Sequence, residues 1–272
     1  MSFCSMFHGG LPAKVRAGRG TLADDAAAHQ ASRRRGLVGL AAGTVAAFPM
    51  GAQAWGLADL WPAVGSGRVT TQQHLPGPIQ GVAVHDAMVV ELRQDQSQAV
   101  QVEVDDNLQA LVDLQVVDGV LQVRQTQPFK ATRLRVQVSV WRLRQLSATG
   151  SGLLQATGLV AEHLRIAAAG SGRVRLNELT AETVRVQAGG SAWVGLTGRA
   201  NDLALTLGGS SVLDGEALAA LRVAATMGGS ASARVWAQQR LTGGIAGSAM
   251  LRYRGTPESS LSTAGSAHVA RL

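Results

Sequence analysis

The stretch at residues 167–196, AAAGSGRVRLNELTAETVRVQAGGSAWVGL, contains two Gly-Ser dipeptides that lie twenty residues apart. The chain holds eight such dipeptides. Seven fall in the last 123 residues, with successive serines 20, 20, 19, 20, 18 and 18 residues apart. Self-similarity at a fixed period near 20 residues is typical of a repeat architecture. We expect these dipeptides to form the repeated structural turn, at Gly150, Ser151, Gly170, Ser171, Gly190, Ser191, Gly209, Ser210, Gly229, Ser230, Gly247, Ser248, Gly265 and Ser266.

The residues between the turns alternate between apolar and polar types. Val184 and Val186 flank Arg185. Arg165 and Arg222 likewise stand between two apolar residues. Alternation with a period of two in short runs of branched residues predicts half-buried strands. The position three residues after each serine is also apolar and is expected to point inward: Leu154, Val174, Val194, Leu213, Ala233, Leu251 and Val269.

Each unit is therefore predicted to contain a turn, a strand, a second turn and another strand. Stacked in parallel, the units would form an all-β solenoid with coils of roughly 20 residues. Glycine suits the corners because it enters positive φ freely, and the serine hydroxyls are expected to hydrogen-bond the turn backbone. A phosphate-binding loop is the alternative for the GSGRV segment at residues 170–174. Such a loop needs one copy, a lysine and a following helix, whereas this segment recurs without either.

The N-terminal region has the pattern of a secretory signal peptide. Three arginines at 33–35 precede an apolar run at about 36–50, and the small-residue motif AQA follows at 52–54. We expect residues 1–54 to be an N-terminal extension and signal peptide, removed by the Sec or the twin-arginine route. The mature chain would be in the periplasm, on the outer surface or secreted, without a transmembrane anchor, because the apolar run is shorter than a membrane span.

Removal of this segment changes the arguments from charge and cysteine content. The mature chain keeps 19 of 25 basic and 16 of 18 acidic residues, so its charge is near +3, and the single cysteine, Cys4, is lost. Since the basic residues are neither clustered nor interleaved with a stacking platform, no nucleic-acid partner is expected. We expect residues 55–78 to be an irregular leading segment and residues 79–272 to be the solenoid, with first strands at 79–146 and regular coils at 147–272.

The segment at residues 78–123, followed by recurring GSGxV corners, resembles the bacterial family called putative auto-transporter adhesin, head GIN domain. The most specific stretches are GSGRVTTQQ at 65–73, VEVDDNL at 102–108 and VDGVLQV at 117–123. The resemblance covers residues 65–272. It implies a right-handed parallel β-helix related to pectin-lyase-type solenoids, a role in adhesion or elsewhere in the cell envelope, and no catalytic residues. The later corners depart from the family pattern, because Ala or Ser replaces the second glycine at residues 192, 211, 231, 249 and 267.

We therefore expect a non-enzymatic envelope or surface protein that presents solenoid faces to a cell-surface glycan or protein, with no catalytic, cofactor-binding or metal-binding residues. Trp193 should point outward, where it could stack on a sugar. A carbohydrate-active lyase or hydrolase is one alternative, but Asp202 and Asp214 should not face each other, and Glu162 and His163 should be solvated. A periplasmic structural or stress factor is another alternative. Calcium at residues 105–107 is disfavoured because a ligand loop needs more widely spaced donors, so these residues are expected to form a turn.

Overall fold

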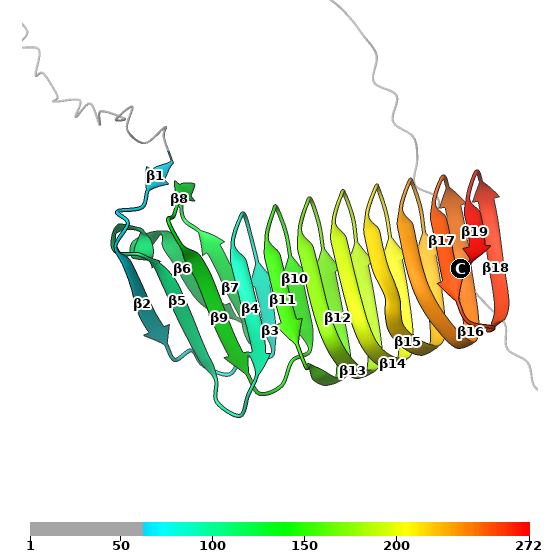
Figure 1. Ribbon diagram of the computed structural model, residues 1–272, viewed down its shortest axis with the longest axis horizontal. Helices are drawn as coiled ribbons and strands as arrows, with labels where there is room; N and C mark the ends of the chain where they lie inside the picture. The colour runs from blue at the N-terminus through cyan, green and yellow to red at the C-terminus, as the bar shows by residue number, and fades with distance from the viewer. Residues whose placement is uncertain (1–61) are drawn as a thin grey trace, which may run out of the picture. The chain divides into compact units, whose positions relative to one another are not determined.

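The structure, a computed structural model, describes residues 62–272, and strands account for most of them (Figure 1). Helix in this part of the chain is limited to the short 3-10 helix η2, Asp106–Leu111. The strands at the N-terminal end are β1 (Ala63–Val64), β2 (Val69–His74), β3 (Gly81–Val84), β4 (Val89–Gln94), β5 (Ala99–Asp105), β6 (Val112–Val117), β7 (Val120–Gln125), β8 (Phe129–Lys130) and β9 (Leu134–Val140). The strands of the regular coils are β10 (Gln145–Ala148), β11 (Leu153–Thr157), β12 (Val160–Ala168), β13 (Arg173–Ala188), β14 (Trp193–Leu207), β15 (Val212–Met227), β16 (Ser232–Gly247), β17 (Met250–Arg254), β18 (Glu258–Gly265) and β19 (His268–Arg271).

Strands β12 to β16 stack in parallel, each beside the strand of the next coil (Figure 1). Aligned residues lie 18 to 20 positions apart, as in the inward column formed by Leu164, Val184, Leu203, Val223 and Leu241. The predicted all-β solenoid with parallel coils of roughly 20 residues is therefore confirmed.

Each complete coil from β13 to β16 is one bent strand of 15 or 16 residues, whereas we expected two strands joined by a turn. The bend coincides with register shifts, for example between Leu176 and Leu179 where β13 pairs with β14. Glu178 and Gly198 have φ values of +56° and +124° at these bends. A single residue with positive φ changes the direction of the strand at the bend. Backbone pairing with the neighbouring coil therefore resumes directly after the bend.

Two faces result from the bend. We call the outward side of the first half of each long strand the first face, and the outward side of its second half the second face. The core between them is one continuous cluster of Val, Leu, Ile, Ala and Met side chains. Val174, Val184, Val186 and Val194 are at most 1% exposed. The predicted inward valines are thus confirmed, and so are the outward arginines Arg165, Arg185 and Arg222, which are exposed.

The coils at the N-terminal end do not stack in sequence order. Strands β3 and β4 pair with β10 and β11 on one side and with β7 and β9 on the other, all in parallel. Along the chain, β3 and β4 come first, but their coil is second in the stack. The chain then forms the outermost coil with β7 and β9. It finally returns to β10, which lies on the other side of the β3–β4 coil. The connection that makes this passage is residues 141–144. It is anchored where the Arg144 N–H donates to the Gln80 carbonyl, at 2.8 Å.

Antiparallel strands close the N-terminal end of the stack. On one side β5 pairs with β9 and β2 pairs with β5, while on the other side β6 pairs with β7. The expectation that residues 55–78 are irregular is corrected, because Val69–His74 within the described part form strand β2. The sequence VTTQQH is polar because β2 lies at the edge of the sheet and is largely exposed, where apolar residues would invite association with other strands.

We predict that Val184→Asp unfolds the solenoid and that Arg185→Ser leaves it nearly unchanged. An unpaired charge at the fully buried Val184 is expected to lower the free energy of unfolding by on the order of 4 kcal/mol. The exposed Arg185 should contribute within about 0.5 kcal/mol. Thermal melting of the two variants measures the difference, and equal midpoints would mean that the assignment of inside and outside is incorrect.

Candidate functional site

The seven predicted corner glycines share one backbone conformation. Their φ values lie between +65° and +76°, which is the left-handed region that favours glycine. The values are the same for corners that keep the second glycine and for corners that have Ala or Ser there. Replacement of the second glycine therefore leaves the corner geometry intact. Ala192, Ser211, Ala231 and Ala249, which stand at that position, are small enough to be buried beneath the corner.

The corners form a column in which each one contacts the next. The N–H of Ser171 donates to the Gly150 carbonyl and that of Ser191 to the Gly170 carbonyl, each at 2.7 Å. A Cβ atom at Gly190 would lie 2.9 Å from the Gly170 carbonyl oxygen. The column thus requires glycine for its φ and also for the space between coils.

The column starts at a residue that the Gly-Ser pattern did not reveal. Asp86 has φ of +57°, and its carbonyl accepts the N–H of Ser151 at 2.9 Å. It occupies the corner of the β3–β4 coil. Its only sequence signal is that aspartate tolerates the left-handed region better than most residues.

The corner serines act through their backbone and not through their side chains. In residues 62–272 the hydrogen bonds at these corners come from the serine N–H groups, and the hydroxyls of the seven serines have no hydrogen-bond partner within the described chain. The expectation that these hydroxyls bond the turn is corrected. Most of the serine side chains are exposed, so water can satisfy them.

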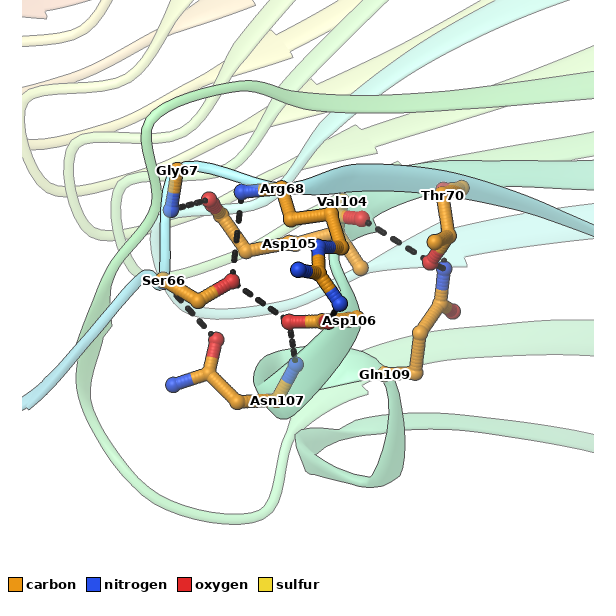
Figure 2. A network of polar contacts seen from close by, with 9 residues as sticks. All are labelled: Ser66, Gly67, Arg68, Thr70, Val104, Asp105, Asp106, Asn107 and Gln109. Atoms are coloured by element: carbon orange, nitrogen blue, oxygen red, sulfur yellow. Dashed lines mark hydrogen bonds and ion pairs between the residues drawn. The ribbon is translucent and has the colours of Figure 1, made fainter.

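A polar cluster joins the loop at residues 65–68 to the start of η2, as Figure 2 shows. We call it the N-terminal polar cluster. The Asn107 Oδ1 atom accepts the N–H of Ser66 at 3.0 Å, and Asp106 Oδ1 accepts the Ser66 hydroxyl and, at 2.8 Å, the N–H of Asn107. The Arg68 guanidinium lies 3.9 Å from Asp106. The residues expected to form a turn thus start η2, and their oxygens accept bonds from a segment 40 residues away.

Asp105 is the buried member of this cluster. Its side chain is fully buried and accepts the N–H groups of Gly67 and Thr132, both at 2.8 Å. Burial by itself raises the pKa of the Asp105 carboxyl, because it removes water from the charged form. The hydrogen bonds from Thr132 and Gly67 outweigh this effect, so the pKa lies below its ordinary value of 3.8. The charged carboxylate therefore holds together the leading loop, η2 and the loop before β9.

The first face carries two tryptophans, each covered by an arginine. The Arg175 guanidinium carbon lies 5.3 Å from the centre of the Trp193 ring, and that of Arg254 lies 4.4 Å from the Trp236 ring. Trp193 is partly exposed beside the buried Val194, so its predicted outward orientation is confirmed. We call Arg175, Trp193, Trp236 and Arg254 the aromatic face.

A groove of about 460 Å³ connects the two halves of the aromatic face. Trp193, Arg175 and Arg254 line it together with Asp214 and Glu216. The benzo edge of the Trp193 ring lies over Gly195, where a Cβ would come within 2.2 Å of the ring. Gly195 thereby lets the indole lie close to the sheet. The groove offers a tryptophan and two arginines, residue types that are enriched at binding surfaces.

Asp202 and Asp214, the two acids considered in the sequence analysis, do not face each other. Asp202 lies on the second face and accepts two bonds from Arg222, at 2.6 and 2.7 Å, whereas Asp214 lies in the groove of the first face, as predicted. The hydrogen bond and charge of Arg222 hold the pKa of Asp202 below its ordinary value, which makes it a poor proton donor. Glu162 and His163 lie 3.4 Å apart with side chains 74% and 66% exposed, so the prediction that they are solvated is confirmed.

The side chain of His85 also has structural partners. His85 bonds to Gln122 at 2.7 Å and to Thr149 at 2.8 Å. In residues 62–272 no group of three or more His, Cys, Asp or Glu side chains is arranged to hold a metal ion. The sequence analysis missed Trp141, a residue that is 55% exposed and lines a hollow of about 830 Å³.

Parallel coils with a glycine corner column and a closed N-terminal end define the chain as a β-solenoid repeat protein. Residues 79–257 match the family described as putative auto-transporter adhesin, head GIN domain, and the chain belongs to this family. The resemblance seen in the sequence is therefore confirmed. No curated protein matches the chain in sequence.

Several solved structures share this fold. A putative adhesin from Bacteroides fragilis NCTC 9343 is 22% identical, with a TM-score of 0.71 over 77% of this chain and 99% of that one. A putative lipid binding protein from Parabacteroides distasonis ATCC 8503 is 19% identical, with a TM-score of 0.65 over 78% and 100%. A putative adhesin from the same organism is 20% identical, with a TM-score of 0.62 over 77% and 99%. At these identities the likeness shows the fold alone.

We predict that Gly170→Val destabilises the protein by more than about 2 kcal/mol, because a branched side chain is strained at positive φ and would press on the Gly150 carbonyl. The neighbouring Ser171→Ala is the matched control. It should change stability by less than about 0.5 kcal/mol, since the hydroxyl is exposed. Melting curves of both variants test this prediction, and a Gly170→Val protein that melts like wild type would contradict a structural role for the corner column.

We predict that Asp105→Asn lowers the melting temperature at pH 7, because the new amide group would point an N–H at one of two backbone N–H donors. A lowered folded pKa means that the carboxylate contributes fully above its unfolded pKa of about 3.9 and that this contribution is lost as pH falls through the folded value. The difference in melting temperature between wild type and Asp105→Asn should therefore shrink below about pH 4. Asp95→Asn removes an exposed carboxylate and is the control. A gap that stays constant down to pH 2 would contradict the role given to the Asp105 charge.

Proposed function

We propose that this protein is an exported, non-enzymatic protein of the cell envelope or surface that attaches to a glycan or protein partner through its aromatic face. Membership in a family described as adhesins supports the proposal, as do the adhesin names of similar structures. Export is supported by the signal-peptide pattern of residues 1–54, which lie outside the described residues. Within residues 62–272, no helix is both long and apolar enough to cross a membrane.

The observation that carries the proposal is the pair of arginine-covered tryptophans on one face of a rigid stack. Exposed tryptophan and arginine side chains are enriched where proteins bind partners. The backbone of each coil is hydrogen-bonded to its neighbours, so these side chains stand on a fixed support. A surface that is already in its binding geometry loses little conformational entropy when a partner binds.

Asp202 and Asp214 do not form the pair of acids that a glycoside hydrolase needs, which supports binding over catalysis. Glycoside hydrolysis needs two carboxylates at a defined separation, one of which donates a proton. Asp202 is engaged by Arg222, and Asp214 lies on the other face. Arginine guanidinium groups lie over the Trp193 and Trp236 rings, and they orient a ligand but do not act as acids at neutral pH.

We predict that Trp193→Ala and Arg175→Gln each weaken attachment of the purified protein to cells and to a glycan array by about tenfold or more, as expected for residues at the centre of an interface. The control is Arg271→Gln, which removes the same charge from an exposed position outside the groove. It should bind like wild type. Retained binding by the Trp193→Ala protein, with an unchanged melting temperature, would show that the aromatic face is not the attachment surface.

A further inference from the structure

A large hollow lies where residues 141–144 pass from the outermost coil to β10. Its volume is about 830 Å³, within the range of small-molecule sites. Side chains from this connection and from β12 line it, chiefly Trp141, Arg142, Arg144, His163 and Arg165. It shares none of these residues with the aromatic face.

The backbone around the hollow is held in place by one glutamine. The Gln94 side-chain amide donates to the carbonyls of Trp141 and Val160, both at 3.0 Å, and its oxygen accepts the N–H of Val160 at 2.7 Å. The N–H of Arg165 also donates to the Arg144 carbonyl at 2.8 Å. The side chains that line the hollow therefore project from fixed positions.

Three arginines and two carboxylates, Asp118 and Glu162, line the hollow, so the arginines are in excess. Within residues 62–272, Arg142, Arg144 and Arg165 have no carboxylate within 4.0 Å, although seven other ion pairs form there. The nearby acid Glu162 is 3.4 Å from His163 instead. Guanidinium groups bind carboxylates through two parallel hydrogen bonds, so three unpaired arginines around one hollow favour an anionic ligand.

The Trp141 ring indicates which class of anionic ligand the hollow would bind. Trp141 is 55% exposed, and the Arg142 guanidinium lies 4.5 Å from its ring centre. One guanidinium is thus oriented by the ring while much of the indole surface stays open. The face of an aromatic ring carries partial negative charge, and it therefore attracts the weakly positive C–H groups on the flat side of a sugar ring.

We propose that this hollow binds a carboxylated saccharide, with Arg144 and Arg165 pairing with its carboxylates and Trp141 stacking on a sugar ring. A hexuronic or sialic acid unit presents both features, a carboxylate and a C–H face. A free phosphate would engage the arginines and leave the tryptophan without a role. This site is additional to the aromatic face and does not depend on the function proposed for that face.

The test measures binding of acidic oligosaccharides to the purified full-length protein by calorimetry. The probes are short hexuronate and sialylated oligosaccharides, each beside its methyl ester, which keeps the sugar ring and removes the charge. We expect one of the acids to bind and its ester to bind at least about tenfold more weakly, since hydrogen bonds to charged groups are the stronger ones. Failure of every acid to bind at millimolar concentration, or equal binding of acid and ester, would overturn the proposal.

Variants then assign the binding to the hollow. Arg144→Gln, Arg165→Gln and Trp141→Ala should each raise the Kd by about tenfold, while Arg271→Gln should leave it unchanged. All four side chains are exposed, so the fold should persist, and melting curves check this. Polyphosphate is the competing anion. If it binds as tightly as the saccharide and Trp141→Ala has no effect on either, the hollow is an unspecific anion surface and the proposal is wrong.

The aromatic-face variant Trp193→Ala separates this proposal from the preceding one. It should weaken attachment to cells and leave binding of the acidic saccharide intact. If Trp193→Ala abolishes saccharide binding and Trp141→Ala does not, the saccharide site lies on the aromatic face, and the assignment to the hollow is overturned.

Discussion

The close approach of one corner to the next is the constraint on which the solenoid depends. Each corner glycine stands with positive φ directly beside the corner of the preceding coil, and at Gly190 even one added carbon would meet the Gly170 carbonyl at 2.9 Å. Since parallel strands must lie about 4.8 Å apart to pair, a bulkier corner would separate the coils and break their ladder. The 18- to 20-residue period of the sequence is therefore the signature of a contact between backbones.

This constraint explains how much of the fold the sequence predicts. Corners and alternating strands are local patterns, so the regular coils and the inward Val184 and outward Arg185 could be predicted. The order of the N-terminal coils could not, because nothing local in the sequence indicates that β7 and β9 lie outside β3 and β4. Asp86 was missed for a related reason, since its corner conformation is visible only once Gly150 is stacked upon it.

The candidate binding surfaces also combine features that are local in the sequence with features that depend on long-range topology. Alternation was enough to place Trp193 outward, but the contact of Trp236 with Arg254 depends on the pairing of β16 with β17, which aligns these two residues. The hollow at Trp141 exists only because the chain has to return across the β3–β4 coil to reach β10. The polar cluster likewise joins Ser66 to Asn107, residues 41 positions apart. Long-range topology creates these sites, and a single sequence does not encode it locally.

Fixed spacing between coils also determines what kind of recognition this scaffold can support. Outward residues in register lie one strand spacing apart, about 4.8 Å, which brings Asp202 into contact with Arg222. Arg175 is in register with Gly195 of the next coil, and because the Trp193 ring lies over Gly195, the guanidinium of Arg175 lies against that ring. Pairs across coils can therefore neutralise charge or orient a guanidinium without any change of backbone. Where such pairing is absent, as for Arg144 and Arg165, the rigid support maintains unpaired positive charge that only a ligand or solvent can neutralise. A stack held by its backbone that carries unpaired outward groups is therefore suited to binding.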